Sequence, residues 1–176
     1  MHANPTPALV ALLATSWVLA CEPASPGDPD PPSPTAAYDV PFRSDTELSR
    51  ELVSVCRAAR EAGRPLLVEF SAAWCSDCRR LHEMKRAPAL ADELARWPAI
   101  VVNVGRFDRH RPLLATLGVE SIAHWEVMAP ARCTEPIGSW PTVARRTLEV
   151  SSGAARDLTP RDLAQWLAAI RTGRRG

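Results

Sequence analysis

Residues 66–78 read LLVEFSAAWCSDC, and this stretch decides the fold that the sequence predicts. Its first five residues, LLVEF, form an apolar run of strand length. The next residues, 71–75, are typical of a turn out of a strand, and a helix is expected to begin at Cys75. A buried strand that passes through a short turn into a helix is a building unit of α/β layer folds. The sequence therefore predicts an α/β domain organised around this stretch.

The segment before this strand predicts an amphipathic helix. Ser44 and Glu47 have the spacing of a capping box, and Gly63 and Pro65 end the helical pattern. Between these signals the apolar residues share one helical face. They are Leu48, Leu52, Val55, Cys56 and Ala59.

Downstream of the stretch, helical and strand patterns alternate. The predicted elements are a helix from residue 75 that is interrupted near Pro88 and resumes at 90–97, a strand at 99–104, a helix at 112–117, strands at 123–128 and 146–150, and a helix from 160. The resulting order, αβαβαββα, is typical of a sheet covered by helices.

Cys75 and Cys78 form a C-x-x-C motif between the buried strand and the start of a helix. Free N–H groups and the helix dipole favour a thiolate on Cys75 at that helix N-terminus. The thiolate is the attacking species in disulfide exchange. Cys78 follows one turn later, where its thiol can attack a mixed disulfide on Cys75 and release the product.

With these residues in place, the chain resembles the thioredoxin superfamily. The resemblance runs from residues 67–70 through 73–78 to 117–122, and it covers about residues 45–171. Residues 102–110, VNVGRFDRH, are similar to a stretch of a bacterial thioredoxin-like family. The resemblance implies a thioredoxin-like α/β fold with a central mixed sheet flanked by helices. It also implies a thiol–disulfide oxidoreductase that needs no cofactor.

The resemblance assigns roles to two further residues. Glu69, six residues before Cys75, matches the family's buried carboxylate, which helps to move the proton of the resolving cysteine. A buried Glu between apolar neighbours is costly, which makes Glu69 notable on its own account, whereas a Glu facing water would have no such role. Trp74 matches the family's tryptophan before the motif and is expected to contact substrate.

The chain departs from the family at the loop that faces the dithiol, where thioredoxins carry a cis-proline. The spacing from the motif places Ile122 and Ala123 in that loop as substrate-binding residues, whereas Pro141 follows eighteen residues later. A cis bond before a residue other than proline costs about 2.5–4 kcal/mol. The Ile122–Ala123 bond is therefore predicted to be trans.

Within the predicted domain, two further cysteines lie outside the motif. Cys56 is on the apolar face of the first helix, where a free buried cysteine is favoured. Cys133 falls in a loop between two strands, and an exposed thiol rarely stays free in an oxidising compartment. Pairing with Cys56, bonding to another chain and burial remain open for Cys133.

A metal-binding chaperone is the alternative function. His82 lies four residues after Cys78, so Cys75, Cys78 and His82 could supply three metal ligands, with His124 as another candidate. The favoured interpretation of His82 is a helix-surface residue, and no metal is expected in the leading hypothesis. A redox-inert scaffold is disfavoured because both cysteines and Glu69 are present.

The N-terminal segment predicts secretion and anchoring. Residues 1–20 are interpreted as a signal peptide, because residues 8–20 are uncharged and too short to span a bilayer. Residues 18–21, VLAC, resemble the bacterial lipobox, which implies lipidation of Cys21. Residues 21–41 contain seven prolines and predict a tether, which leaves residues 42–176 as the domain.

The charge balance limits the classes of partner. Lys and Arg number 21 against 20 Asp and Glu, which argues against a general nucleic-acid-binding protein. The expected partners are protein thiols and disulfides, an electron-donor protein and, through the lipid, a membrane. The expected location is the bacterial cell envelope, with the domain in the periplasm or outside. The sequence leaves open whether the protein reduces, oxidises or isomerises.

Overall fold

A computed structural model of the chain describes residues 38–149 and 157–173. Its elements, in chain order, are α1 (Asp45–Glu61), β1 (Leu66–Ser71), α2 (Ser76–Met84), α3 (Pro88–Leu94), β2 (Ala99–Asn103), α4 (Arg111–Leu117), β3 (His124–Met128), the 3-10 helix η1 (Ile137–Ser139), β4 (Thr142–Thr147) and α5 (Pro160–Arg171). The predicted signal peptide, the lipidation site Cys21 and most of the predicted tether lie outside the described residues. Among the helices of the described part, none has the length and apolar character needed to cross a bilayer.

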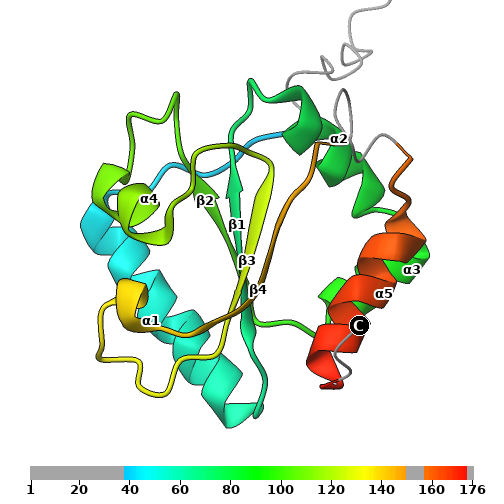
Figure 1. Cartoon of the computed structure of the whole chain (residues 1–176). Coiled ribbons are helices and arrows are strands. Elements are labelled where there is room, and N and C mark those ends of the chain that lie inside the picture. The colour runs from blue at the N-terminus through cyan, green and yellow to red at the C-terminus, as the bar shows by residue number, and fades with distance from the viewer. Residues whose placement is uncertain (1–37, 150–156, 174–176) are drawn as a thin grey trace, which may run out of the picture. The chain divides into compact units, whose positions relative to one another are not determined.

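The strands form one mixed sheet in the order β2-β1-β3-β4. β1 is parallel to β2 and antiparallel to β3, and β4 is antiparallel to β3. Figure 1 shows α1 and α4 on one face of this sheet and α2, α3 and α5 on the other. The predicted thioredoxin-like architecture, a central mixed sheet flanked by helices, is confirmed.

β1 is the central element, and all six of its residues are buried. It has a partner strand on each edge and helices on each face, which explains why its sequence is almost continuously apolar. The helix before it starts as predicted: the Ser44 N–H donates to Glu47 Oε2 at 2.7 Å, and the Glu47 N–H donates to Ser44 Oγ at 3.2 Å. β1 ends at Ser71, four residues before the first cysteine of the dithiol motif.

The last strand lies earlier in the chain than predicted. β4 spans Thr142–Thr147, whereas the apolar pattern predicted residues 146–150. β4 is a half-exposed edge strand, so its sequence lacks the apolar alternation on which the prediction relied. Leu148 is one of the apolar residues on which the prediction relied, and it is fully buried just beyond the strand. Its N–H donates to the Ala123 carbonyl at 2.8 Å.

The folded part begins before Phe42, where the sequence placed its start. Tyr38 and Val40 are buried in the core, and Asn103 Nδ2 donates to the Val40 carbonyl at 2.6 Å. Phe42 itself is 63% exposed. The proline-rich composition of residues 22–41 concealed two alternating apolar side chains that pack against the domain.

The Ile122–Ala123 peptide bond is cis, so the prediction of a trans bond is wrong. That prediction weighed only the local cost of the bond. It could not include the tertiary setting, in which Ala123 is fully buried and its carbonyl accepts a hydrogen bond from Leu148.

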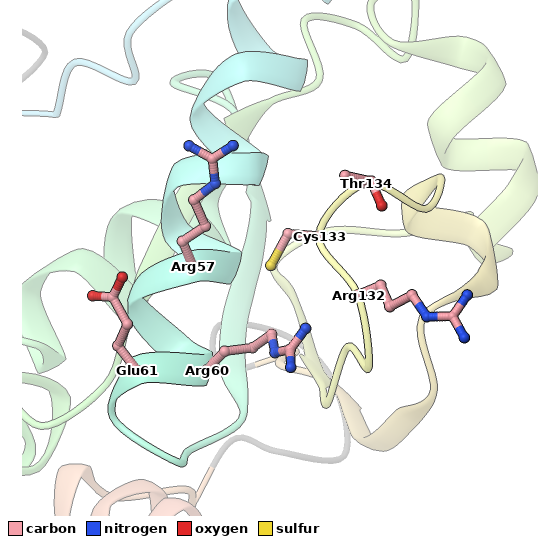
Figure 2. Close-up of a pocket in the computed structure, with 6 residues that line it drawn as sticks. All are labelled: Arg57, Arg60, Glu61, Arg132, Cys133 and Thr134. Atoms are coloured by element: carbon pink, nitrogen blue, oxygen red, sulfur yellow. The ribbon is translucent and has the colours of Figure 1, made fainter.

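Cys56 and Cys133 form a disulfide with a Cα–Cα distance of 5.6 Å, so the prediction of a free buried Cys56 is wrong. The apolar face that suggested a free thiol does bury Cys56, but the loop after β3 brings Cys133 to it. Figure 2 shows the Cys133 sulfur directed toward α1, beside a surface pocket. The pocket has a volume of about 540 Å³ and is lined by Arg57, Arg60, Glu61, Arg132, Cys133 and Thr134.

This second disulfide lies far from the C-x-x-C motif. Cys133 follows the end of β3, where Met128 pairs with Leu66 at the beginning of β1. Cys75 follows the other end of β1, roughly 17 Å away at about 3.3 Å per residue. The two disulfides therefore occupy opposite ends of the sheet.

Candidate active site

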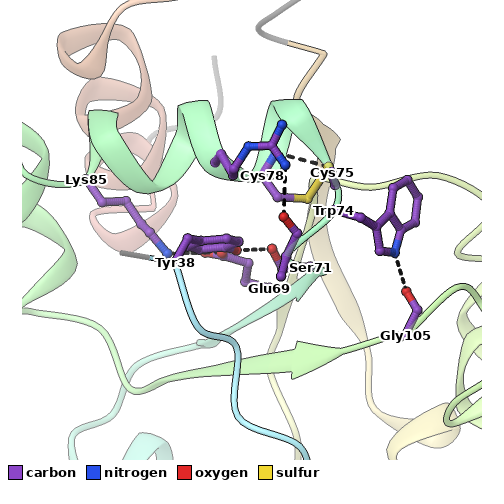
Figure 3. The surroundings of a disulfide bond; sticks show 10 residues. Tyr38, Glu69, Ser71, Trp74, Cys75, Cys78, Lys85 and Gly105 are labelled. Atoms are coloured by element: carbon purple, nitrogen blue, oxygen red, sulfur yellow. Dashed lines mark hydrogen bonds and ion pairs between the residues drawn. A yellow bond between two sulfur atoms is a disulfide. The ribbon is translucent and has the colours of Figure 1, made fainter. Parts of the chain in front are cut away.

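The dithiol motif lies at the start of α2. Cys75 is the N-cap of this helix, and its sulfur accepts a hydrogen bond from the Cys78 N–H at 3.0 Å. The two cysteines form a disulfide with a Cα–Cα distance of 5.2 Å, shown in Figure 3. Cys75 retains slight exposure, whereas Cys78 has none. The placement that the sequence suggested, one thiol at the helix end and one inside its first turn, is the placement in the structure.

Glu69 is buried in β1, with an exposed fraction of 3%. Lys85 Nζ lies 3.0 and 2.9 Å from its two carboxylate oxygens, and Trp125 Nε1 donates to Oε2 at 3.0 Å. Glu69 therefore does not face water, and its charge and its hydrogen-bonding capacity are both matched.

Lys85 joins the site from α2. It is the C-cap of this helix, and its side chain turns inward to Glu69 with only 21% exposed. Sequence spacing could not reveal this pairing, because the carboxylate is on a different element.

Tyr38 and Ser71 are site residues that the sequence did not identify. The Tyr38 hydroxyl is hydrogen-bonded to Ser71 Oγ, and Figure 3 shows the two side chains beside Glu69. Burial, followed by the negative charge of Glu69, raises the pKa of Tyr38 to about 12, against the opposing effect of the Ser71 hydrogen bond. Tyr38 therefore keeps its proton throughout the physiological pH range. The available signal was an aromatic residue at the end of a proline-rich segment.

Trp74 is exposed next to the nucleophile. Its indole Nε1 donates to the Gly105 carbonyl at 2.6 Å, and 46% of the residue is accessible. The ring lies 6.4 Å from Phe107, centroid to centroid. A cavity of about 350 Å³ borders this tryptophan, and its other lining residues are Asp39, Val40, Phe42, Ala72, Ala73, Asn103, Gly105, Arg106, Asp108 and Arg109. The arrangement leaves an apolar surface open beside Cys75.

Ile122 and Ala123 precede β3 at the end of the sheet that carries the motif. His124 pairs with Phe70, so the two residues before it lie at the carboxyl end of β1. Pro141 is at the opposite end, where its carbonyl accepts a hydrogen bond from the Ala129 N–H at 2.9 Å. The register thus agrees with the spacing argument and separates Pro141 from the dithiol.

The ligand set of the metal-binding alternative is not assembled. Within residues 38–149 and 157–173, no group of three or more His, Cys, Asp or Glu side chains is arranged to hold a metal ion. The His82 ring packs against Tyr38 with a centroid distance of 4.8 Å. His124 hydrogen-bonds to Thr147 and to Glu126. In this structure His82 and His124 thus each have contacts other than the dithiol.

A second buried carboxylate, Glu126, is on β3. It has no exposed surface, and it is hydrogen-bonded to His124 and to Thr142, with Arg145 at 3.2 Å. Burial alone would raise the pKa of Glu126, but the hydrogen bonds and the charge of Arg145 together outweigh it and lower the pKa. Its neighbours in β3, Trp125 and Val127, point to the opposite sheet face. Glu126 therefore lies on the face opposite that of Glu69, whose partner is Trp125.

The fold and the dithiol define a thioredoxin-like domain. Residues 51–117 match the family model described as Thioredoxin-like. No curated protein matches the chain.

Solved structures are similar to this chain at low sequence identity. The disulphide isomerase of Xylella fastidiosa Temecula1 is 20% identical, with a TM-score of 0.57 over 75% of this chain and 97% of that chain. The oxidised C-terminal domain of Neisseria meningitidis DsbD is 16% identical, with a TM-score of 0.49 over 74% and 100%. A thioredoxin from Thermus thermophilus is 20% identical, with a TM-score of 0.46 over 68% and 81%. At the general level, the Cys75–Cys78 pair in this fold supports thiol–disulfide oxidoreductase chemistry.

Proposed function

We propose that the protein is a cell-envelope thiol–disulfide oxidoreductase that exchanges disulfides with protein clients through Cys75 and Cys78. The observation that carries the proposal is the position of Cys75 as the N-cap of α2, with its sulfur accepting the Cys78 N–H. A backbone donor and the positive end of the helix dipole both stabilise a thiolate there.

The proposed reaction has two exchange steps. The Cys75 thiolate attacks one sulfur of a client disulfide, a mixed disulfide forms, and the other client sulfur leaves as a thiolate. The Cys78 thiol then loses its proton and attacks the Cys75 sulfur. This step forms the Cys75–Cys78 disulfide and releases the second client thiolate. The client gains two electrons and the protein loses two, which a partner dithiol returns in the reverse sequence.

Glu69 is proposed to receive the proton of Cys78. Its carboxylate is kept in a buried site by Lys85 and Trp125 and is shielded from bulk water. A charged acceptor in such a setting acts more strongly than one in water. The exposed face of Trp74 and the Ile122–Ala123 loop are proposed to contact the client on either side of Cys75.

The reduction potential of the Cys75–Cys78 pair tests this function and gives its direction. A value near −270 mV is that of a reductant, one near −180 mV is that of an isomerase, and one near −120 mV is that of an oxidant. The measurement equilibrates the protein with glutathione buffers and quantifies the two forms by alkylation. A pair that does not exchange with glutathione would contradict the proposal. The Cys56→Ala/Cys133→Ala variant should give the same potential, which assigns the signal to the motif.

The cell-envelope location rests on the N-terminal sequence. An uncharged run that ends in residues 18–21, VLAC, followed by a proline-rich segment, supports lipidation of Cys21 and tethering of the domain. Fractionation should place the wild-type protein in membranes and a Cys21→Ala variant in the soluble fraction. If both forms remain soluble in the envelope, the anchoring proposal is wrong, although the exchange chemistry is unaffected.

A further inference from the structure

Tyr38 reaches the dithiol site from the segment that precedes α1. It is 33 residues from Ser71 in sequence, yet its hydroxyl is hydrogen-bonded to the Ser71 side chain at the carboxyl end of β1. Its ring packs on His82 in α2, with centroids 4.8 Å apart and planes inclined by 53°. Tyr38 therefore bridges the strand that leads into the motif and the helix that carries it.

The groups that face Tyr38 include the charges of the proton-accepting site. Glu69 and Ser71 come from β1 and His82 comes from α2, while Lys85 of α2 pairs with Glu69. Glu69 is close enough to Tyr38 for its charge to oppose ionisation of the hydroxyl. Burial, followed by the charges of Lys85 and Arg86, lowers the pKa of His82, so this ring is neutral at neutral pH. Tyr38 thus places a neutral aromatic ring next to a buried ion pair.

The exposed fractions of the side chains describe how far water reaches the Glu69–Lys85 pair beside the Tyr38 ring. Tyr38 is 6% exposed and the Glu69 side chain 5%, whereas the Lys85 side chain is 21% exposed. The Glu69 carboxylate is therefore shielded from water, whereas the Lys85 ammonium group is more accessible to it. Removal of the Tyr38 ring would open the site on the side of α2, where Figure 3 shows the ring beside Glu69.

We infer that Tyr38 is a positioning residue for the second exchange step, because its ring excludes water from the Glu69–Lys85 pair and its hydroxyl is anchored on Ser71. This inference rests on the proposed function. Without the ring, water would reach the carboxylate and solvate it. The interaction between Glu69 and Lys85 would also weaken as the local dielectric rises. The pH dependence of proton removal from Cys78 would change, while Cys75 itself would be untouched.

The reaction with 5,5′-dithiobis-(2-nitrobenzoate) separates the two steps. The reduced Cys75 thiolate cleaves the reagent, keeps one nitrothiobenzoate as a mixed disulfide and releases the other. Cys78 then attacks Cys75, forms the Cys75–Cys78 disulfide and releases the second nitrothiobenzoate, with its proton passing to the buried carboxylate. Each release is a coloured signal, so stopped-flow absorbance gives both rates at each pH.

The expected results distinguish a positioning residue from a structural one. In Tyr38→Ala the pH midpoint of the second release should differ from that of the wild type by at least about half a unit, with the first release within twofold of the wild type. Tyr38→Phe keeps the ring and should retain the wild-type midpoint. Leu163→Ala, which removes a buried side chain from α5, should lose stability but leave the midpoint unchanged.

Three outcomes would overturn the inference: an unchanged midpoint in Tyr38→Ala, an equal change in Tyr38→Phe, or an equal change in Leu163→Ala. Each is read from the second release in a protein whose first release is normal. If the wild-type protein gives no release from Cys75 at all, the proposed function fails instead, and the two failures are thereby distinguished.

Discussion

The backbone N–H of Cys78 donates to the sulfur of Cys75, at 3.0 Å. One cysteine thus supplies a donor that stabilises negative charge on the other, while its own side chain is fully buried inside the first turn of α2. The asymmetry assigns different tasks to two chemically identical groups. Cys75 has the stabilised and slightly exposed sulfur, so it attacks first, and Cys78 resolves.

A trapping experiment checks this order. Cys78→Ala leaves the mixed disulfide without a resolving thiol and should accumulate covalent complexes with client proteins, whereas Cys75→Ala should form none. In the reduced protein, iodoacetamide at pH 7 should modify Cys75 at least about tenfold faster than Cys78, because the thiolate is the reactive form. Mass spectrometry of the modified peptides measures both rates. Equal rates at the two thiols would reverse or abolish the assignment.

Lys85→Met should destabilise the protein by removing the partner of Glu69. An unpaired buried carboxylate is costly, and breaking a buried pair costs about 3–5 kcal/mol, so roughly 2–4 kcal/mol is expected here because Lys85 is partly exposed. Urea unfolding of the oxidised protein at pH 7 provides the measurement.

A double variant and a surface control complete this test. Adding Glu69→Gln removes the orphaned charge and should restore much of the lost free energy of unfolding. Arg80→Met interrupts an ion pair in which Arg80 is 58% and Glu83 62% exposed, and should cost less than about 1 kcal/mol. If Lys85→Met lowers the free energy of unfolding by no more than Arg80→Met does, the buried pair contributes little to stability.

The parts of the fold that the sequence predicted are those with strong local signals. The capping box at Ser44, the apolar strand from Leu66 and the motif cysteines each depend on neighbours within a few residues. β4 was misplaced because its exposed edge has no apolar period, and pairing with β3 defines it instead.

The rest of the candidate site could not be predicted because its partners come from distant elements. Lys85 contacts Glu69 only after α2 packs over β1. Tyr38 and Ser71, which are hydrogen-bonded, are separated in the sequence by the whole of α1. The pairing of Cys56 with Cys133 spans 77 residues. Such contacts leave no periodic or spacing signal in a single sequence.

The Cys56–Cys133 disulfide should stabilise the fold and leave the dithiol chemistry intact. Closing a loop of 77 residues removes chain entropy worth about 4.5 kcal/mol from the unfolded state. The Cys56→Ala/Cys133→Ala variant should therefore lose up to that amount in urea unfolding, with the motif kept oxidised. Its exchange rate with glutathione at Cys75 should stay within twofold of the wild type. A large loss of exchange would show that the second disulfide takes part in catalysis.

Glu126 should make stability fall in acid. Its pKa in the folded protein is lowered, because its hydrogen bonds and Arg145 outweigh the opposing effect of burial. A lowered folded-state pKa adds stability that is complete above the unfolded-state value of 4.5 and is lost as the pH falls through the folded-state value. Glu126→Gln removes this titration and breaks charged hydrogen bonds, so it should cost about 1–3 kcal/mol at pH 7.

The difference between the wild type and Glu126→Gln should therefore be largest near neutral pH and should shrink below about pH 4.5 as the wild-type carboxylate is protonated. Urea unfolding at half-unit intervals from pH 3 to pH 7 measures it. Titrating groups that do not contact Glu126 are common to both proteins and cancel in the difference. Glu83→Gln, at an exposed position, should show a small and nearly pH-independent difference. A difference for Glu126→Gln that stays constant from pH 7 to pH 3 would mean that Glu126 acts through its shape and not through its charge.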